Sequence, residues 1–169
     1  MPFVEVFSTP GTPRPEQRRQ IAQRLVGEVM AGEGAPDNEF ARSISWLVWH
    51  ELAAWSVGGE PIGPEQPPRY VVRVAMPRGS LTDEKRSEVV SRVTKVLAEA
   101  DDDPDRFYSS AAAFVLIDAI PEGDWGGVGR VVRFNQIANY VMTGSLEPMS
   151  DEDVKAFVNA GPRLEEATR

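Results

Sequence analysis

An internal duplication constrains the fold of this chain more than any other feature of its sequence. A strand-like segment (3–8), a turn rich in proline and glycine and a helix-like segment (15–30) precede a second strand-like segment (44–52). The same order follows later, where RYVVRVAMPRGSLTDEKRSEVVSRV aligns with PFVEVFSTPGTPRPEQRRQIAQRLV strand for strand, turn for turn and helix for helix. Such a repeat indicates that each copy is one supersecondary unit.

Both helix-like segments carry an apolar face at helical spacing. In the first segment this face comprises Ile21, Ala22, Leu25, Val26, Val29 and Met30, and in the second Val89, Val90, Val93, Val96 and Leu97. Gly32 and Gly34 are expected to end the first helix. The second is expected to begin near Thr82, with acidic residues in its first turn, and to end at the run 101–104. Each helix is therefore predicted to pack on a sheet.

A second strand follows each helix. The first of them, 44–52, is apolar on both faces and rich in tryptophan, which is typical of a strand covered on both sides. The other, 111–120, reads AAAFVLIDAI. Each leads into an aromatic and glycine hairpin, WSVGG from Trp55 and WGGVG from Trp125.

Strands joined through a helix run parallel, because the crossover is right-handed and long. Two such units predict an α/β fold: two fused β-α-β units that form a four-stranded sheet with two helices on one face. The other face would expose large side chains such as Trp46 and Trp49. We therefore expect the chain to oligomerise through that face.

The chain is predicted to form a single domain followed by a tail. The stretch PIGPEQPPR, with four prolines, predicts a stiff and exposed connector. The tail carries a helix start at Ser150, with a capping box in SDED, and Gly161 is expected to end that helix. The predicted divisions are a domain over 1–144, made of a first repeat (2–62), a connector (63–69) and a second repeat (70–144), and a tail over 145–169.

Composition excludes several classes of function. The sequence has no cysteine and one histidine, so no metal site and no thiol chemistry are expected. A net charge of −8 disfavours nucleic acid as a partner. No apolar run approaches the roughly 20 residues that cross a bilayer, and no secretory signal is apparent, so a cytoplasmic protein that does not bind membranes is expected. The run Gly127-Val128-Gly129 does not complete a dinucleotide fingerprint, so no nucleotide cofactor is expected.

The chain begins MPFVEVF, with a proline directly after Met1. One interpretation is geometric, because the first residue of a strand is a place where a sheet tolerates proline. The other is chemical: methionine aminopeptidase usually removes a methionine that precedes proline, and Pro2 would then carry a free secondary amine. Such an amine is a base.

An N-terminal proline that opens a β-α-β unit, followed by a hairpin of aromatic and glycine residues, resembles the tautomerase superfamily. This family includes 4-oxalocrotonate tautomerase, macrophage migration inhibitory factor, malonate semialdehyde decarboxylase and the chloroacrylic acid dehalogenases. The likeness covers about residues 2–144. It implies a homotrimer of fused subunits with sites between subunits, and a cofactor-independent reaction in which Pro2 is catalytic. A general base matched to the working pH contributes on the order of 100 to 10,000-fold in rate.

Arginines are the expected partners of Pro2, because a guanidinium can hold a carboxylate and stabilise an enolate. Arg78, in the turn after the first strand of the second repeat, is the main catalytic candidate. The decarboxylase and dehalogenase members place an arginine pair in this turn, and only one arginine is found here. Arg73 is a candidate for the second cation, although a strand arginine with its head in solvent explains it equally. Arg14 lies in the matching turn of the first repeat and is a further substrate-binding candidate.

Two aromatic residues and a histidine complete the set. The resemblance assigns Trp125 or Trp55 to the wall of the active site, with Trp125 preferred, whereas packing on a neighbouring chain is the alternative. His50 and Glu51 end the second strand, where a substrate-binding or water-activating group would be expected beside a pocket. A structural role is the alternative for a lone histidine.

Three functions follow as hypotheses. The leading one is a tautomerase or isomerase in which Pro2 is the general base on a small 2-oxo or enol carboxylic acid. The second is a hydrolytic dehalogenase or decarboxylase of three-carbon acids, with Pro2 as the acid and Glu51, His50 or Asp118 positioning water. The third is a non-catalytic binding protein that retains Met1, which would leave Pro2 as an amide nitrogen without basicity.

Overall fold

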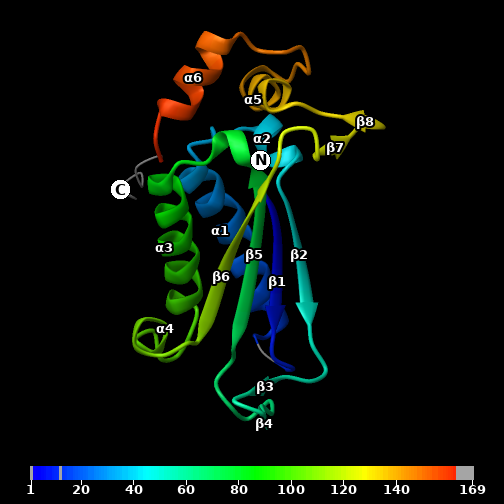
Figure 1. Ribbon diagram of the computed structural model, residues 1–169. Coiled ribbons are helices and arrows are strands. Elements are labelled where there is room, and N and C mark those ends of the chain that lie inside the picture. The colour runs from blue at the N-terminus through cyan, green and yellow to red at the C-terminus, as the bar shows by residue number, and fades with distance from the viewer. Residues whose placement is uncertain (1, 12, 163–169) are drawn as a thin grey trace.

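A computed structural model describes residues 2–11 and 13–162 of the chain (Figure 1). Met1, whose removal is predicted, and residues 163–169 at the end of the predicted tail lie outside the described residues. The elements are β1 (Phe3–Ser8), α1 (Pro15–Glu33), α2 (Glu39–Ser43), β2 (Trp46–Glu51), β3 (Ser56–Val57), β4 (Glu60–Pro61), β5 (Tyr70–Pro77), the 3-10 helix η1 (Arg78–Ser80), α3 (Asp83–Glu99), α4 (Arg106–Ser109), β6 (Ala113–Ile120), β7 (Gly126–Gly127), β8 (Arg130–Val131), α5 (Phe134–Thr143) and α6 (Asp151–Asn159).

The four long strands form one mixed sheet in the order β2-β1-β5-β6. Strand β1 runs parallel to β2, and β5 runs parallel to β6, as expected for two β-α-β units. The two units meet through the antiparallel pair of β1 and β5, where Phe3 is opposite Ala75. The predicted α/β fold with a four-stranded sheet is confirmed.

The long helices α1 and α3 lie side by side on one face of this sheet (Figure 1). Alternation along β1 directs Val4 and Val6 to the helices, where both are fully buried. The helices contribute the apolar stripes predicted from their spacing, including Leu25 and Val93. The predicted placement of both helices on one face is therefore confirmed.

The two repeats correspond with a shift of one residue from the sequence alignment. The sequence pairs Val4 with Val71, whereas the helix-facing counterpart of Val4 in β5 is the buried Val72. Both hairpins close in the same way: Ile62 N donates to Trp55 O at 2.8 Å, and Val132 N donates to Trp125 O at 2.9 Å.

Several predicted boundaries and one predicted environment were wrong. Helix α1 continues to Glu33, because the left-handed position that ends it is Gly34, with φ of 82°. The second strands are shorter than predicted, 46–51 and 113–120. Strand β2 is an edge strand covered on one face only, so Trp46 is 65% exposed. Trp49, predicted to be on the uncovered face, instead packs against the helical core and donates through Nε1 to Ser8 Oγ at 2.9 Å.

The uncovered face of the sheet combines an exposed apolar surface with a row of charges. Its exposed apolar side chains are Trp46, Val48, Phe114 and Leu116. Between them, Arg73 on β5 pairs with Glu5 on β1 at 3.3 Å and with Asp118 on β6 at 2.7 Å. This face is the one through which the sequence predicts oligomerisation.

Beyond the sheet, α5 and α6 form a second, smaller layer at one end of the molecule (Figure 1). Val141 of α5 is buried with Met30 and Ala41, and Phe157 of α6 packs against the same cluster. The predicted tail helix begins where expected, because Ser150 Oγ accepts from Asp153 N at 3.2 Å. Helix α5 was not predicted. Among the described residues, no helix is both long and apolar enough to span a membrane.

Helix α1 offers a matched pair of glycine substitutions. A Cβ at Gly32 would lie 2.9 Å from Val89 Cγ2 and 3.2 Å from the Val89 backbone, whereas a Cβ at Gly27 meets nothing closer than 4.0 Å. We expect Gly32→Ala to destabilise the protein by about 1 to 3 kcal/mol through overpacking. Gly27→Ala should stabilise it by about 0.5 to 1 kcal/mol, because Gly is unfavourable inside a helix. Urea unfolding of both variants tests this, and equal effects would contradict the close α1–α3 contact.

Candidate active site

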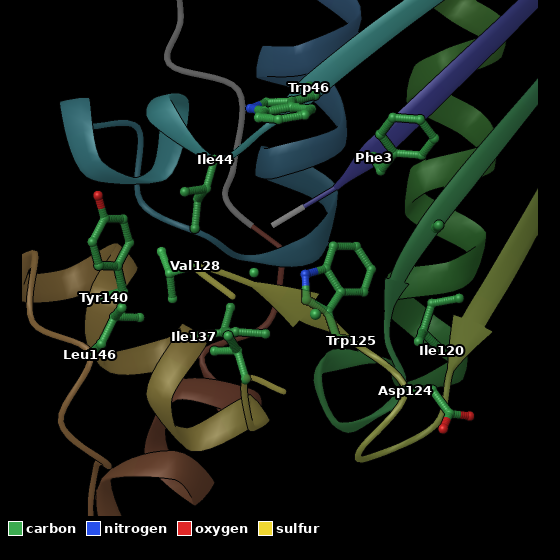
Figure 2. A pocket seen from close by; sticks show the side chains of 14 residues that line it. Phe3, Ile44, Trp46, Ile120, Asp124, Trp125, Val128, Ile137, Tyr140 and Leu146 are labelled. Atoms are coloured by element: carbon green, nitrogen blue, oxygen red, sulfur yellow. The ribbon is translucent and has the colours of Figure 1, made fainter. Parts of the chain in front are cut away.

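A cavity of about 610 Å³ opens at the end of the sheet where β1 begins and where β5 and β6 end. The sheet contributes Phe3, Trp46 and Ala75 to its wall, and the hairpin of β7 and β8 contributes Trp125 and Val128. Figure 2 shows that α5 and the segment after it supply a further part of the wall, with Ile137, Tyr140 and Leu146. Three separate parts of the chain therefore enclose one site.

The lining is almost entirely apolar. Among the side chains that line the cavity, the polar groups are the carboxylate of Asp124, the hydroxyl of Tyr140 and the indole nitrogens of two tryptophans. Asp124 lies at the edge of the cavity, beside Ile120 (Figure 2). Apolar pockets with a few polar groups are typical of small-molecule sites, and about 300 to 1,000 Å³ is their usual size.

Pro2 lies directly before the cavity. It is buried, its carbonyl accepts from Trp46 N at 3.1 Å, and the next residue, Phe3, forms part of the cavity wall. The antiparallel pairing of β1 with β5 brings this start of β1 to the level of the end of β5. Pro2 and Trp125, two of the predicted site residues, are thus found at the same end of the sheet.

Arg78 is found at this end too. It begins η1 directly after β5, is exposed, and makes no ion pair with any residue in the ranges 2–11 and 13–162. The short helix η1 is packed on α5, since a Cβ at Gly79 would lie 2.8 Å from the ring of Phe134. Arg78 does not line the cavity itself, but it is exposed next to the elements that do.

The other predicted cations lie elsewhere in the chain. Arg73 is in the middle of the sheet, held by Glu5 and Asp118. Arg14 caps the N-terminus of α1 at the opposite end of the sheet, where its backbone N donates to Gln17 Oε1 at 3.1 Å. Neither arginine lines the cavity.

His50 and Glu51 also lie at the far end of the sheet, and neither lines this cavity. The ring of His50 stacks on Phe7, with centroids 4.6 Å apart, and His50 Nε2 is 3.3 Å from Glu5 Oε1. Glu51 accepts from Gly11 N at 2.7 Å and pairs with Arg18. These contacts lower the pKa of Glu51, the Gly11 N–H having the larger effect.

The two hairpin tryptophans are separated in the same way. Trp125 lines the cavity, whereas Trp55 belongs to the β3–β4 hairpin at the other end of the sheet (Figure 1). The second repeat also lacks a counterpart of Pro2, because Tyr70 opens its first strand. The two ends of the sheet therefore differ chemically.

Sequence reasoning missed several residues of the cavity wall. Ile137 and Tyr140 belong to α5, whose apolar positions at Phe134, Ile137 and Val141 have helical spacing and were the available signal. Asp124 and Val128 flank the predicted Trp125, but their orientation depends on the geometry of the hairpin. Leu146 follows α5 without a regular pattern.

Fold and cavity together define an α/β protein of two fused β-α-β units with an apolar cavity at one end of the sheet. The family model described as "Tautomerase enzyme" matches residues 71–135. No curated protein matches the chain at significant similarity.

Solved structures of the same fold include three informative ones. Pt0534 inactivated by 2-oxo-3-pentynoate is 21% identical, with a TM-score of 0.62, over 76% of this chain and 94% of that one. An asymmetric trimer of wild-type fused 4-OT is 24% identical over the same shares, with a TM-score of 0.60. A macrophage migration inhibitory factor-like protein from Entamoeba histolytica is 12% identical, over 77% of this chain and 97% of that one, with a TM-score of 0.58.

The resemblance to the tautomerase superfamily is therefore confirmed by the family model over residues 71–135. The solved structures show that the fold is shared over 76% of the chain.

Proposed function

We propose that this protein is a cofactor-independent tautomerase in which Pro2, freed by removal of Met1, is the general base on a small 2-oxo or enol carboxylic acid. The observation that carries the proposal is the apolar cavity whose wall begins at Phe3, the residue next to Pro2. The tautomerase family match supports the reaction class.

The proposed reaction moves one proton within the substrate. The neutral amine of Pro2 takes a proton from the carbon next to the carbonyl and returns it at another position, so that no atom is gained or lost. Arg78 donates to the substrate carboxylate or to the oxygen on which negative charge develops. Trp125 and the other apolar side chains of the cavity exclude water, which strengthens these interactions.

The proposal also concerns how the chains assemble, because assembly would give a role to the candidate residues that do not line the cavity. We propose a homotrimer formed through the uncovered face of the sheet, because an exposed apolar surface of this kind marks an interaction site. Three of the similar structures are trimers of fused 4-OT. A site shared between subunits would give Arg73, Arg14 and His50 of one chain a role at the cavity of another.

Contacts of the predicted water-activating groups favour tautomerisation over hydrolytic dehalogenation or decarboxylation. Glu51 is held by Gly11 and Arg18, and Asp118 is held by Arg73. His50 lies against Phe7 and Glu5. None of the three lines the cavity of its own chain, and the two carboxylates already pair with arginines, which makes them less available to position a water molecule.

Turnover of an enol acid tests the proposal. The purified protein should convert the enol of phenylpyruvate or 2-hydroxymuconate to the keto form faster than buffer alone, followed by ultraviolet absorbance. Arg78→Ala should lower kcat/KM by about 10 to 100-fold, because a hydrogen bond to a charged group contributes about 1.5 to 3 kcal/mol. The control is Arg19→Ala, which removes an exposed arginine from α1. Equal losses in both variants, or no turnover by the native protein, would contradict the proposal.

A further inference from the structure

The two repeats present the same kind of apolar surface on the uncovered face of the sheet. Val48 on β2 and Leu116 on β6 are equivalent positions of the two β-α-β units in the register of the sheet. Both are exposed, and each follows an exposed aromatic residue two positions earlier, Trp46 or Phe114. The apolar side chains of this face therefore do not distinguish one half of the sheet from the other.

This internal symmetry lets a chain sit in a ring in two orientations. A half-turn about an axis through the β1–β5 pair exchanges the repeats and leaves the uncovered face on the same side. In the proposed trimer, the head-to-tail orientation puts the edge strand β2 of each chain beside β6 of the next, and the ring closes with equal contacts. One chain that is turned over instead puts β2 beside β2 at one contact and β6 beside β6 at another.

Charged side chains on the same face do distinguish the two halves. They form a diagonal charge row of His50 on β2, Glu5 on β1, Arg73 on β5 and Asp118 on β6. The Glu5 carboxylate contacts both of its neighbours, with Oε1 3.3 Å from His50 Nε2 and Oε2 3.3 Å from Arg73 Nη1. Arg73 Nη2 donates to Asp118 Oδ2 at 2.7 Å. Glu5 occupies the position that Arg73 has in the other repeat, and His50 and Asp118 correspond in the same way.

The two ends of the charge row have opposite hydrogen-bonding character. His50 carries a ring N–H in either protonation state, and a positive charge when it is protonated. Asp118 is a carboxylate that only accepts, and a carboxylate has about four lone-pair sites, more than the bond from Arg73 uses. The side chains of His50 and Asp118 are 37% and 40% exposed. The edge at β2 therefore offers a donor, and the edge at β6 offers an acceptor.

We infer that the uncovered face binds a second copy of this chain in one orientation, head to tail, and that the charge row selects this orientation. Head-to-tail contacts bring the donor edge of one chain to the acceptor edge of the next, which continues the alternation of charges around the ring. A turned chain brings two acceptor edges together, and the two Asp118 carboxylates repel each other. The inference rests on the proposed trimer, and it gives every cavity of the ring the same neighbour.

Chemical cross-linking reports the orientation directly, because the native sequence has no cysteine. Val48→Cys and Leu116→Cys each place one thiol on one edge strand. A bismaleimide shorter than the roughly 14 Å of three strand spacings does not join the two thiols within one chain. The double variant should therefore form covalent trimers. If both orientations were equally stable, about three quarters of the trimers would contain a turned chain, and each single variant should give at least about tenfold less covalent dimer than that.

A charge variant tests the cause of the selection. Asp118→Asn in the Leu116→Cys protein removes the repulsion between acceptor edges, and should raise the yield of covalent dimer at least about threefold with native circular dichroism. The control is Asp102→Asn in the same background, which removes an exposed carboxylate between α3 and α4 and should leave the yield unchanged. Equal yields in these two variants, or covalent dimer from either single variant at the level of equal stability, would overturn the inference.

Light scattering and turnover separate this inference from the proposed function. A monomeric native protein would contradict both the proposed trimer and its orientation. A native trimer whose double variant forms no covalent trimer would contradict the orientation alone. A trimer that cross-links as expected but converts no enol acid would support the orientation and contradict the proposed reaction.

Discussion

Pro2→Ala will lower kcat/KM for an enol acid by about 100 to 10,000-fold, the usual contribution of a positioned general base. After removal of Met1, the alanine of this variant would also carry a free amine at the N-terminus. It lacks the ring, however, and therefore the secondary amine and the fixed orientation that the ring gives to the nitrogen at the start of β1. The loss should appear mainly in kcat, because the apolar wall that binds the substrate is unchanged.

Its control is Pro67→Ala, which removes an exposed proline from the connector between the repeats. That variant should retain native kcat/KM, and both should show native circular dichroism. A Pro2→Ala protein as active as the Pro67→Ala protein would remove the proposed mechanism.

The pH dependence of the same reaction separates a base from an acid. A general base works in its neutral form, so kcat/KM should rise as pH increases through the pKa of the Pro2 amine and then level off. If Pro2 is instead a general acid, as in the dehalogenase and decarboxylase hypothesis, it works in its protonated form, and kcat/KM should fall as pH increases over the same range.

Leu116→Arg will dissociate the proposed trimer. Leu116 is on the uncovered face of the sheet and 48% exposed in one chain, so a trimer formed there would bury it. An unpaired charge in such an interface costs several kcal/mol, enough to shift a micromolar assembly to monomers. Light scattering after size-exclusion chromatography measures the mass directly.

The matched control for assembly is Val90→Arg. Val90 is an apolar residue of α3 that is 38% exposed on the side of the molecule away from the uncovered sheet face. The variant should keep the native mass. A native monomer, or a Leu116→Arg protein of native mass, would contradict assembly through the sheet.

Periodicity predicted those parts of the fold that depend on local pattern. The apolar stripes of α1 and α3 and the repeated β-α-β order suffice for two parallel strand pairs. The environment of each strand depends on strand order, which the sequence does not encode locally. Trp46 and Trp49 were assigned to the same face for a different reason: the alternation of side chains along the strand was not applied, although residues three apart in a strand lie on opposite faces.

Some residues of the candidate site could likewise be predicted from the sequence, and others could not. Pro2 and Trp125 were predicted from a resemblance, and the antiparallel β1–β5 pair explains why they occur at one end. Arg73 was predicted either as a second substrate cation or as a strand arginine with its head in solvent. Its ion pairs with Glu5 and Asp118 were not predicted, because those partners come from two other strands. Val128 could not be recognised, because its place in the cavity wall depends on the geometry of the β7–β8 hairpin.

The central claim, that Pro2 acts through a free amine, is tested most directly by the intact mass of the protein after expression with its own first codon. We expect the mass of the chain without Met1. A mass that includes Met1 and all 169 residues would leave Pro2 as an amide nitrogen and contradict the account.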